Sequence, residues 1–118
     1  VLCGKKIRLY DYREKEKTMI KHIVLWKLKD HAEGADKNQN AQKMKSALEA
    51  LKSKIPQIRH IEVGINFVPS DAAYDVALYS EFASAQDLEI YQKHPEHLKV
   101  ADFVGKVREQ RAVVDYNI

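Results

Sequence analysis

The segment Tyr91-Gln-Lys-His94-Pro95-Glu-His97 places a phenol and two imidazoles on either side of a proline. The residue before a proline avoids the helical region, so the helix that contains Tyr91 is expected to end near His94. Pro95 suits the first position of a second helix, where its missing N–H is not needed. The segment therefore predicts a corner between two helices, which can direct three titratable side chains into one pocket.

The helices on both sides of this corner have sequence signals of their own. Ser84 followed by Asp87 is typical of a capping box at the start of the first helix. Leu88 and Tyr91, three residues apart, share the inward face of that helix. In the second helix, the residues that recur with the 3.6-residue helical period are His97, Ala101 and Val104. His97 is therefore expected on an otherwise apolar helix face.

Each titratable residue of the corner has a structural and a functional interpretation. A histidine on an apolar face is often a hydrogen-bonded core residue, and a buried tyrosine hydroxyl often has a protein partner. As a cation at a helix C-terminus, His94 would interact favourably with the helix dipole and need no other role. The functional interpretation is that Tyr91 and His97 act together on a ligand. Both interpretations stay open on this evidence.

Alternation with a period of two predicts strands over residues 20–29, 58–68 and 74–82 and a last strand over 111–116. In the first strand, one face carries Ile20, His22, Val24, Trp26 and Leu28 and the other Lys21, Ile23, Leu25 and Lys27. The inward face of the second strand is expected to carry Ile61, Val63, Ile65 and Phe67. The apolar face of the third is expected to carry Tyr74, Val76, Leu78, Ser80 and Phe82.

Between the first two strands, a polar loop over 30–36 precedes an amphipathic helix of about four turns that ends at Pro56. The apolar stripe of this helix consists of Ala41, Met44, Leu48, Leu51 and Ile55. The order of elements is β-α-β-β-α-β, which predicts an α+β protein with the ferredoxin-like plan.

A four-stranded sheet with helices on one side leaves its other side bare. The residues that such a layer cannot all bury are Ile23, Leu25, Ile61 or its neighbours, and Val113 or Val114. A second subunit is the simplest cover, so a twofold homodimer is predicted.

The composition indicates one globular domain. The chain has 118 residues, of which 45% are hydrophobic and 31% are charged. Its formal charge of +3 comes from residues 1–18, while the rest holds as many basic as acidic residues. Without a basic block in residues 19–118, a nucleic-acid partner is not expected. No apolar run reaches the roughly 18 residues of a membrane span, so no membrane partner is expected.

Residues 1–18 are interpreted as an N-terminal extension outside the core fold, and residues 19–118 as the folded domain. The extension lacks the apolar stretch of a secretory signal. The single cysteine, Cys3, lies in it and has no intramolecular partner, so a reducing compartment, the cytoplasm, is expected. Deleting the extension is expected to leave the fold intact.

No metal or cofactor is expected. His94 and His97 are three residues apart, but Pro95 interrupts the helix between them and no acidic or thiol ligand stands at a matching spacing. The four glycines are scattered and form no phosphate-binding loop.

The sequence resembles the stress-responsive α/β-barrel family, also called the dimeric α+β barrel or Dabb domain, over residues 19–118. The matching segments are Lys21 to Lys27, Glu62-Val-Gly64, Glu81-Phe82, Tyr91 to His97, Val100 and Val114-Asp115-Tyr116. The resemblance implies two ferredoxin-like protomers whose sheets face each other to form a barrel.

The family includes olivetolic acid cyclase, an enzyme that needs neither metal nor cofactor, and the resemblance to it implies site residues. Tyr91 and His97 match its catalytic tyrosine and histidine, and His22 matches its first-strand histidine. Ligand-binding positions are expected at Val24, Trp26, Leu78 and His94. Two departures, Val76 in place of a histidine and Trp26 in place of a smaller aliphatic residue, argue against a long alkyl-chain substrate.

The resemblance leaves more than one function open. The first is a stress-associated homodimer that binds a small hydrophobic or aromatic ligand or persists as a stable assembly. The alternative is a cofactor-independent lyase, cyclase or isomerase acting on a small β-keto or polyketide-like substrate, in which His97 removes a proton and Tyr91 stabilises the enolate. Monooxygenase-like chemistry, known in related barrels, is a further alternative. An open cavity beside Trp26 favours a ligand or substrate, whereas a cavity filled by Trp26 favours a structural role.

Overall fold

The computed structural model describes residues 19–118. The expectations for the extension and for Cys3 concern residues 1–18 and therefore lie outside the described part of the chain. In chain order, the elements are β1 (Ile20–Leu28), β2 (His31–Ala32), β3 (Ala35–Asp36), α2 (Lys37–Glu49), the 3-10 helix η1 (Ala50–Ser53), β4 (Ile58–Ile65), β5 (Val76–Phe82), α3 (Ala85–Lys93), α4 (Pro95–Val107) and β6 (Arg108–Asn117).

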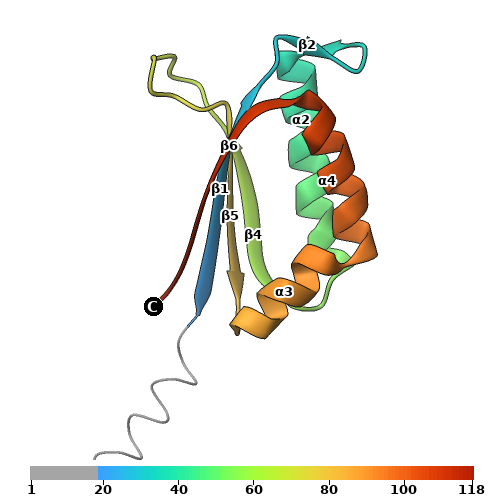
Figure 1. Cartoon of the computed structure of the whole chain (residues 1–118), viewed down its shortest axis with the longest axis vertical. Coiled ribbons are helices and arrows are strands. Elements are labelled where there is room, and N and C mark those ends of the chain that lie inside the picture. The colour runs from blue at the N-terminus through green and yellow to red at the C-terminus, as the bar shows by residue number, and fades with distance from the viewer. Residues whose placement is uncertain (1–18) are drawn as a thin grey trace, which may run out of the picture.

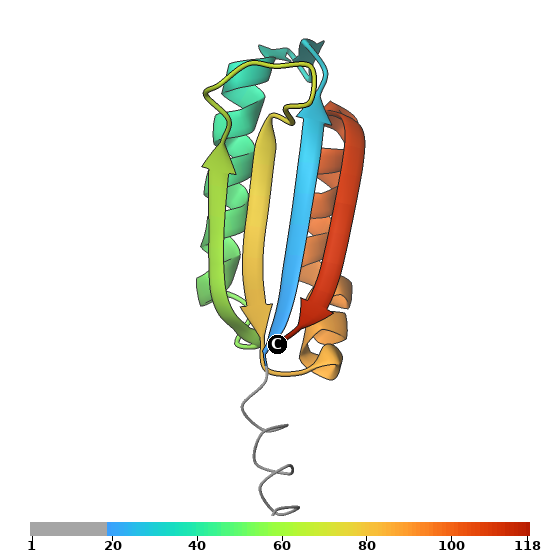
Figure 2. The same ribbon diagram turned by 90° about the vertical axis from the view of Figure 1, so that its left-hand side faces the viewer.

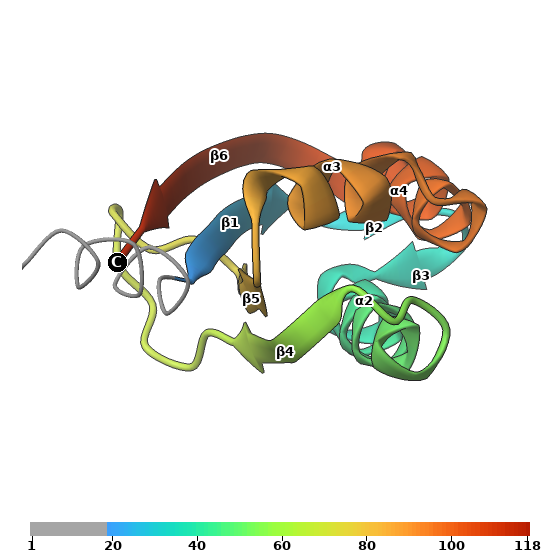
Figure 3. The same ribbon diagram turned by 90° about the horizontal axis from the view of Figure 1, so that it is seen from below.

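The four long strands form one antiparallel sheet in the order β4-β5-β1-β6, and the helices cover one of its faces (Figure 1). This strand order and the order of elements along the chain confirm the predicted ferredoxin-like plan. Figure 3 shows β4 and β6 at opposite edges of the sheet, with α2 on the β4 side and α4 on the β6 side.

The core lies between the sheet and the helices. On β1, the side chains of His22, Val24, Trp26 and Leu28 are buried there. On β5, the buried side chains are Val76, Leu78, Ser80 and Phe82. The predicted stripe of the first helix is also buried, although α2 ends at Glu49 and η1 continues the chain to Ser53. On β1, β5 and the first helix the two-residue and 3.6-residue periods thus identified the inward faces correctly.

The corner forms as predicted. At the start of α3 the Asp87 N–H donates to the Ser84 hydroxyl, so Ser84 caps the helix, but the reciprocal bond of the predicted capping box, from the Ser84 N–H to the Asp87 carboxylate, is not formed. The helix ends at Lys93, because His94 adopts an extended backbone before the proline. Pro95 is then the first residue of α4. The proline therefore fixes the angle at which Tyr91 and His97 approach each other from two helices.

Two predicted strands are too long at one end, and the predicted loop has structure. β4 ends at Ile65, so Phe67 is not inward but 89% exposed, and Tyr74 precedes β5.

Residues 31–36 form a small hairpin of β2 and β3. Glu33 and Gly34, both with positive φ, make its two-residue turn. The strands of this hairpin are too short to show a two-residue hydrophobic period. The polar composition of the segment therefore did not reveal the hairpin.

The face of the sheet opposite the helices is uncovered in the single chain (Figure 2). Register places six residues in its apolar part: Ile23, Leu25, Ala77, Tyr79, Ala112 and Val114. Val114 is 57% exposed and Tyr116 is 42% exposed. Of the alternatives given for β4, Ile61 pairs with Ser80 and lies on the helix side, as the alternation of that strand predicted, whereas its neighbour Glu62 pairs with Tyr79 on the bare face. Val113, opposite Val24, also lies on the helix side.

Candidate active site

A cavity of about 290 Å³ lies between the helices and the inner face of the sheet. Its wall consists of His22, Val24 and Trp26 from β1, Leu48 from α2, Leu78 from β5, Tyr91 from α3, His97, Ala101, Val104 and Gly105 from α4, and Arg108 and Arg111 from β6. The side of the wall formed by β1, β5 and α3 is buried, whereas Ala101, Gly105 and the two arginines are exposed. The cavity therefore opens to solvent between α4 and β6.

Tyr91 is fully buried and lines this cavity. Its hydroxyl has no hydrogen-bond partner among the described residues. Burial raises the pKa of this hydroxyl above its ordinary value, and the positive charge of Arg111 opposes the shift only in part. Tyr91 therefore keeps its proton and remains a hydrogen-bond donor.

His97 packs against Tyr91, with ring centroids 4.5 Å apart. Its Nδ1 lies 3.1 Å from the backbone carbonyl of Gln92. Because a carbonyl can only accept, Nδ1 carries a proton and the neutral ring has its lone pair on Nε2. Burial lowers the pKa of His97, the Gln92 carbonyl opposes this, and the charges of His22, Arg111 and His94 lower it further. His97 therefore has the tautomer and the charge state of a base.

His22 is held in place from the other side of the cavity. Its Nδ1 pairs with the carboxylate of Asp115 on the neighbouring strand β6. Its ring lies 6.2 Å from the ring of Tyr91, in an edge-to-face arrangement. Asp115 thus orients the imidazole of His22 toward the same group of rings.

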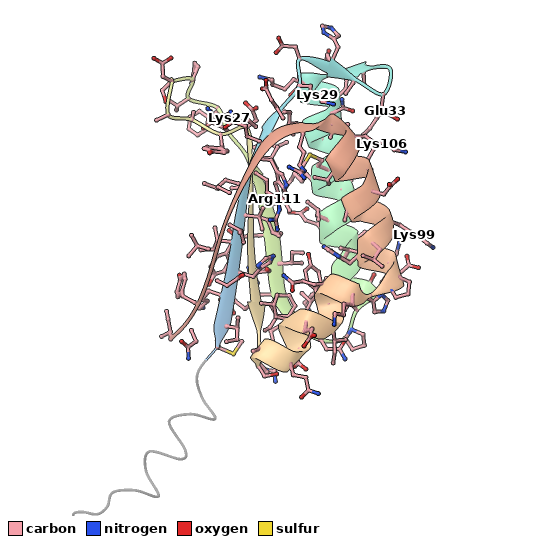
Figure 4. The ribbon with its side chains drawn as sticks, in the orientation of Figure 1. Lys27, Lys29, Glu33, Lys99, Lys106 and Arg111 are labelled. Carbon is pink, nitrogen blue, oxygen red and sulfur yellow. The ribbon has the colours of Figure 1, made fainter. Side chains whose placement is uncertain are left out.

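Arg111 stands on β6 opposite Trp26 and lies between the sheet and the helices (Figure 4). Among the described carboxylates, none forms an ion pair with Arg111 or with Arg108, the second arginine of the wall. Asp115, on the same strand as Arg111, is paired with His22 instead. The open end of the cavity is therefore cationic.

The structure brings six of the seven sequence-predicted site residues together. Tyr91, His97, His22, Val24, Trp26 and Leu78 all line the cavity. Trp26 forms part of the wall and does not fill the space. The seventh residue, His94, is not in the wall: its Nδ1 accepts a hydrogen bond from the Glu96 N–H and caps α4. Its predicted ligand-binding role has no support from this geometry.

Sequence reasoning gave no role to Asp115, Arg108 or Arg111. The signal that would have found them is register, because residues paired across antiparallel strands share a face. With β6 aligned on β1, Asp115 falls beside His22 and Arg111 beside Trp26.

The comparisons with known proteins agree with this architecture. A family model described as "Stress responsive A/B Barrel Domain" matches residues 20–118. The chain belongs to this family. A curated member, a stress-response A/B barrel domain-containing protein of Arabidopsis thaliana, is 34% identical over 83 residues. The alignment covers 70% of this chain and 30% of that protein, so the chain spans less than a third of that relative.

Solved structures of similar fold include a protein of unknown function and an enzyme. A dimeric ferredoxin-like protein of unknown function from Bacteroides fragilis is 43% identical, with a TM-score of 0.76 over 85% of this chain and 96% of that one. A hydroxynitrile lyase from Passiflora edulis has a TM-score of 0.71 at 20% identity, over 85% of this chain and 93% of that one. The likeness to the lyase concerns the fold alone.

Within residues 19–118, no group of three or more histidine, cysteine, aspartate or glutamate side chains is arranged to hold a metal ion. None of the described helices is long and apolar enough to cross a membrane.

We expect the free energy of unfolding to decrease as the pH falls through about 6.5, the ordinary pKa of histidine. Because the pKa of His97 is lower in the folded protein, the unfolded chain binds a proton there that the folded chain does not. The stabilisation is complete above the unfolded pKa and is lost as the pH falls toward the folded one. Denaturant titrations of the protein and of His97→Gln on both sides of this pH measure the effect. Equal pH dependence in the two proteins would contradict it.

Proposed function

We propose that this A/B barrel domain binds a small carbonyl compound in the cavity and moves a proton at the carbon next to the carbonyl, without a cofactor. The observation that carries the proposal is the hydroxyl of Tyr91. It is buried, it has no partner among the described residues, and it belongs to a ring packed on a histidine with a free Nε2.

If Tyr91 had only a structural role, its buried hydroxyl would lack a hydrogen-bond partner, and the folded protein would lose stability. Buried polar groups usually have a hydrogen-bond partner, and an unsatisfied one costs about 1–3 kcal/mol. A ligand oxygen in the cavity would remove that cost. The unpaired donor therefore favours a ligand-binding role over a purely structural one.

The two side chains supply complementary halves of the chemistry. Nε2 of His97 takes the proton from carbon, and the electron pair moves to the carbonyl oxygen, where the Tyr91 hydroxyl donates a hydrogen bond. His22, oriented by Asp115, stands beside Tyr91 and completes the group of rings on this side of the cavity. Proton transfer of this kind is the common step of cofactor-independent lyases, cyclases and isomerases. The hydroxynitrile lyase of similar fold supports the view that this architecture can hold an enzyme.

We also propose that the protein is a homodimer joined through the bare face of the sheet. Neighbours of the same fold, including the one from Bacteroides fragilis, are described as dimeric. The apolar part of the face continues into a polar cluster in which the Lys21 amine donates to the Tyr79 hydroxyl at 2.8 Å and to the Glu81 carboxylate at 2.7 Å. These polar groups are already paired within one chain, so a second chain could cover them with little loss of hydrogen bonds.

A non-catalytic role remains the competing proposal, because the family is named for stress response and several neighbours have no known function. In that case the cavity would hold a small hydrophobic or aromatic ligand without changing it. The two proposals differ in whether a bound carbonyl compound exchanges its protons.

Tyr91→Phe is expected to lower the catalysed rate of deuterium exchange into pentane-2,4-dione about 100- to 1,000-fold, because the variant loses the donor to the enolate oxygen. Exchange in heavy water is followed by NMR above the buffer rate. The ring volume is kept, so the melting temperature should not fall. Binding without exchange in the unchanged protein would instead support the non-catalytic role.

A further inference from the structure

The charge of the cavity wall indicates which carbonyl compounds fit. Two arginines and two histidines line it, and none of its twelve residues is acidic. Arg108 and Arg111 stand at the exposed end, without an ion-pair partner in the described part of the chain. An arginine that has no carboxylate partner within the protein can pair with an anion from solution.

Two further hydrogen-bond donors of the cavity wall have no acceptor in the described part of the chain. The indole N–H of Trp26 and the hydroxyl of Tyr91 are buried and have no partner among residues 19–118. Trp26 is 5% exposed and Tyr91 is fully buried. An oxygen atom of a ligand that reaches these groups can accept a hydrogen bond from them, whereas a hydrocarbon cannot. A purely hydrophobic ligand therefore fits this wall poorly.

We infer that the substrate is a small keto acid, whose carboxylate is bound by Arg111 and whose carbonyl oxygen faces Tyr91. This inference deepens the proposed function and rests on it for the position of the carbonyl group. A guanidinium matches the planar carboxylate with two parallel N–H···O bonds. The volume of about 290 Å³ lies at the lower end of the range of small-molecule sites, which favours a compact acid.

The chemistry on a β-keto acid is balanced within the site. A proton leaves the carbon between the carbonyl and the carboxylate for Nε2 of His97, the electron pair of the C–H bond forms the C=C bond of the enolate, and the π pair of the carbonyl group moves to its oxygen. The enolate oxygen is held by Tyr91, and the carboxylate stays on Arg111. In heavy water, return of a deuteron from His97 restores the keto form with one deuterium at that carbon.

Acetoacetate and pentane-2,4-dione make a matched pair of probes, because a carboxylate in the first replaces an acetyl group in the second. We expect the 118-residue chain to bind acetoacetate about tenfold more tightly than the diketone, as a charge-assisted hydrogen bond would give. In Arg111→Gln, the ratio of the two dissociation constants should fall to about one. Arg111→Lys, which keeps the charge and loses the planar geometry, should show an intermediate ratio.

Arg59→Gln is the matched control, because it removes the same charge at an exposed position outside the cavity wall. It should keep the tenfold ratio, and melting temperatures of all variants should confirm that they fold. The inference would be overturned by equal affinity for the two probes or by no binding of acetoacetate. It would also be overturned if inorganic phosphate competed for the cavity more strongly than acetoacetate does. Exchange of the diketone without a preference for acetoacetate would overturn the inference alone. Arg111-dependent binding of acetoacetate without exchange would overturn the proposed catalysis alone.

Discussion

His97→Gln is expected to lower the catalysed rate of deuterium exchange into pentane-2,4-dione by about 100- to 10,000-fold, the usual contribution of a general base. Glutamine can still donate to the Gln92 carbonyl, which accepts from Nδ1 of His97 in the structure. It has no basic nitrogen, so no side chain that α4 contributes to the cavity wall can then take the proton. The loss should appear in kcat and in kcat/KM together, because proton transfer belongs to the transition state.

His31→Gln is the control for this variant, since His31 is exposed on β2 and lies outside the cavity wall. It should keep the full exchange rate. A different result for His97→Gln would contradict the proposal: a loss of stability of about 1–3 kcal/mol with an unchanged exchange rate would mean that the imidazole serves only as a hydrogen-bonded structural group. Melting curves and exchange rates measured on the same preparations separate these outcomes.

The part of the fold that local chemistry controls could be predicted from the sequence. The two-residue period of β1 identified its buried face, because side chains alternate across any strand. The end of α3 before Pro95 followed from steric restriction, which acts between neighbouring residues. The end of β4 could not be predicted in this way. Phe67 continues the alternation of β4, but the ladder between β4 and β5 ends at Ile65 and Val76, and pairing is not visible in one segment alone.

The candidate site was predictable only where its residues lie on the two helices of the corner or on β1. Arg111 and Asp115 enter it through the pairing of β6 with β1, so their position depends on a register that the sequence does not display. His94 is a residue for which the sequence predicted a place in the site that the structure does not give it. Its neighbours in sequence line the cavity, but the extended backbone before Pro95 turns its ring toward the start of α4. Closeness in sequence to Tyr91 and His97 therefore did not mean a place in the cavity wall.

Leu25→Asp is expected to abolish the dimer at micromolar concentration. Leu25 stands on the bare face of the sheet between Ala77 and Ala112, so it is the largest apolar side chain of these three paired positions. A carboxylate in that contact would be buried without a partner in both subunits, at a cost of several kcal/mol each. Light scattering should then report the 13.6 kDa mass of one chain, where the unchanged protein gives twice that mass.

Gln42→Asp adds the same charge at an exposed position of α2, on the helical side of the molecule, and should leave the dimer intact. Leu25→Ala keeps the face apolar and removes most of the projecting side chain. It should weaken the dimer without unfolding the chain, which separates loss of association from loss of fold if the aspartate variant proves unstable. A full dimer in Leu25→Asp, or a single-chain mass for the unchanged protein, would show that the bare face is not the contact. A full dimer in the aspartate variant would place the contact on another surface, whereas a single-chain mass for the unchanged protein would refute the proposed dimer itself.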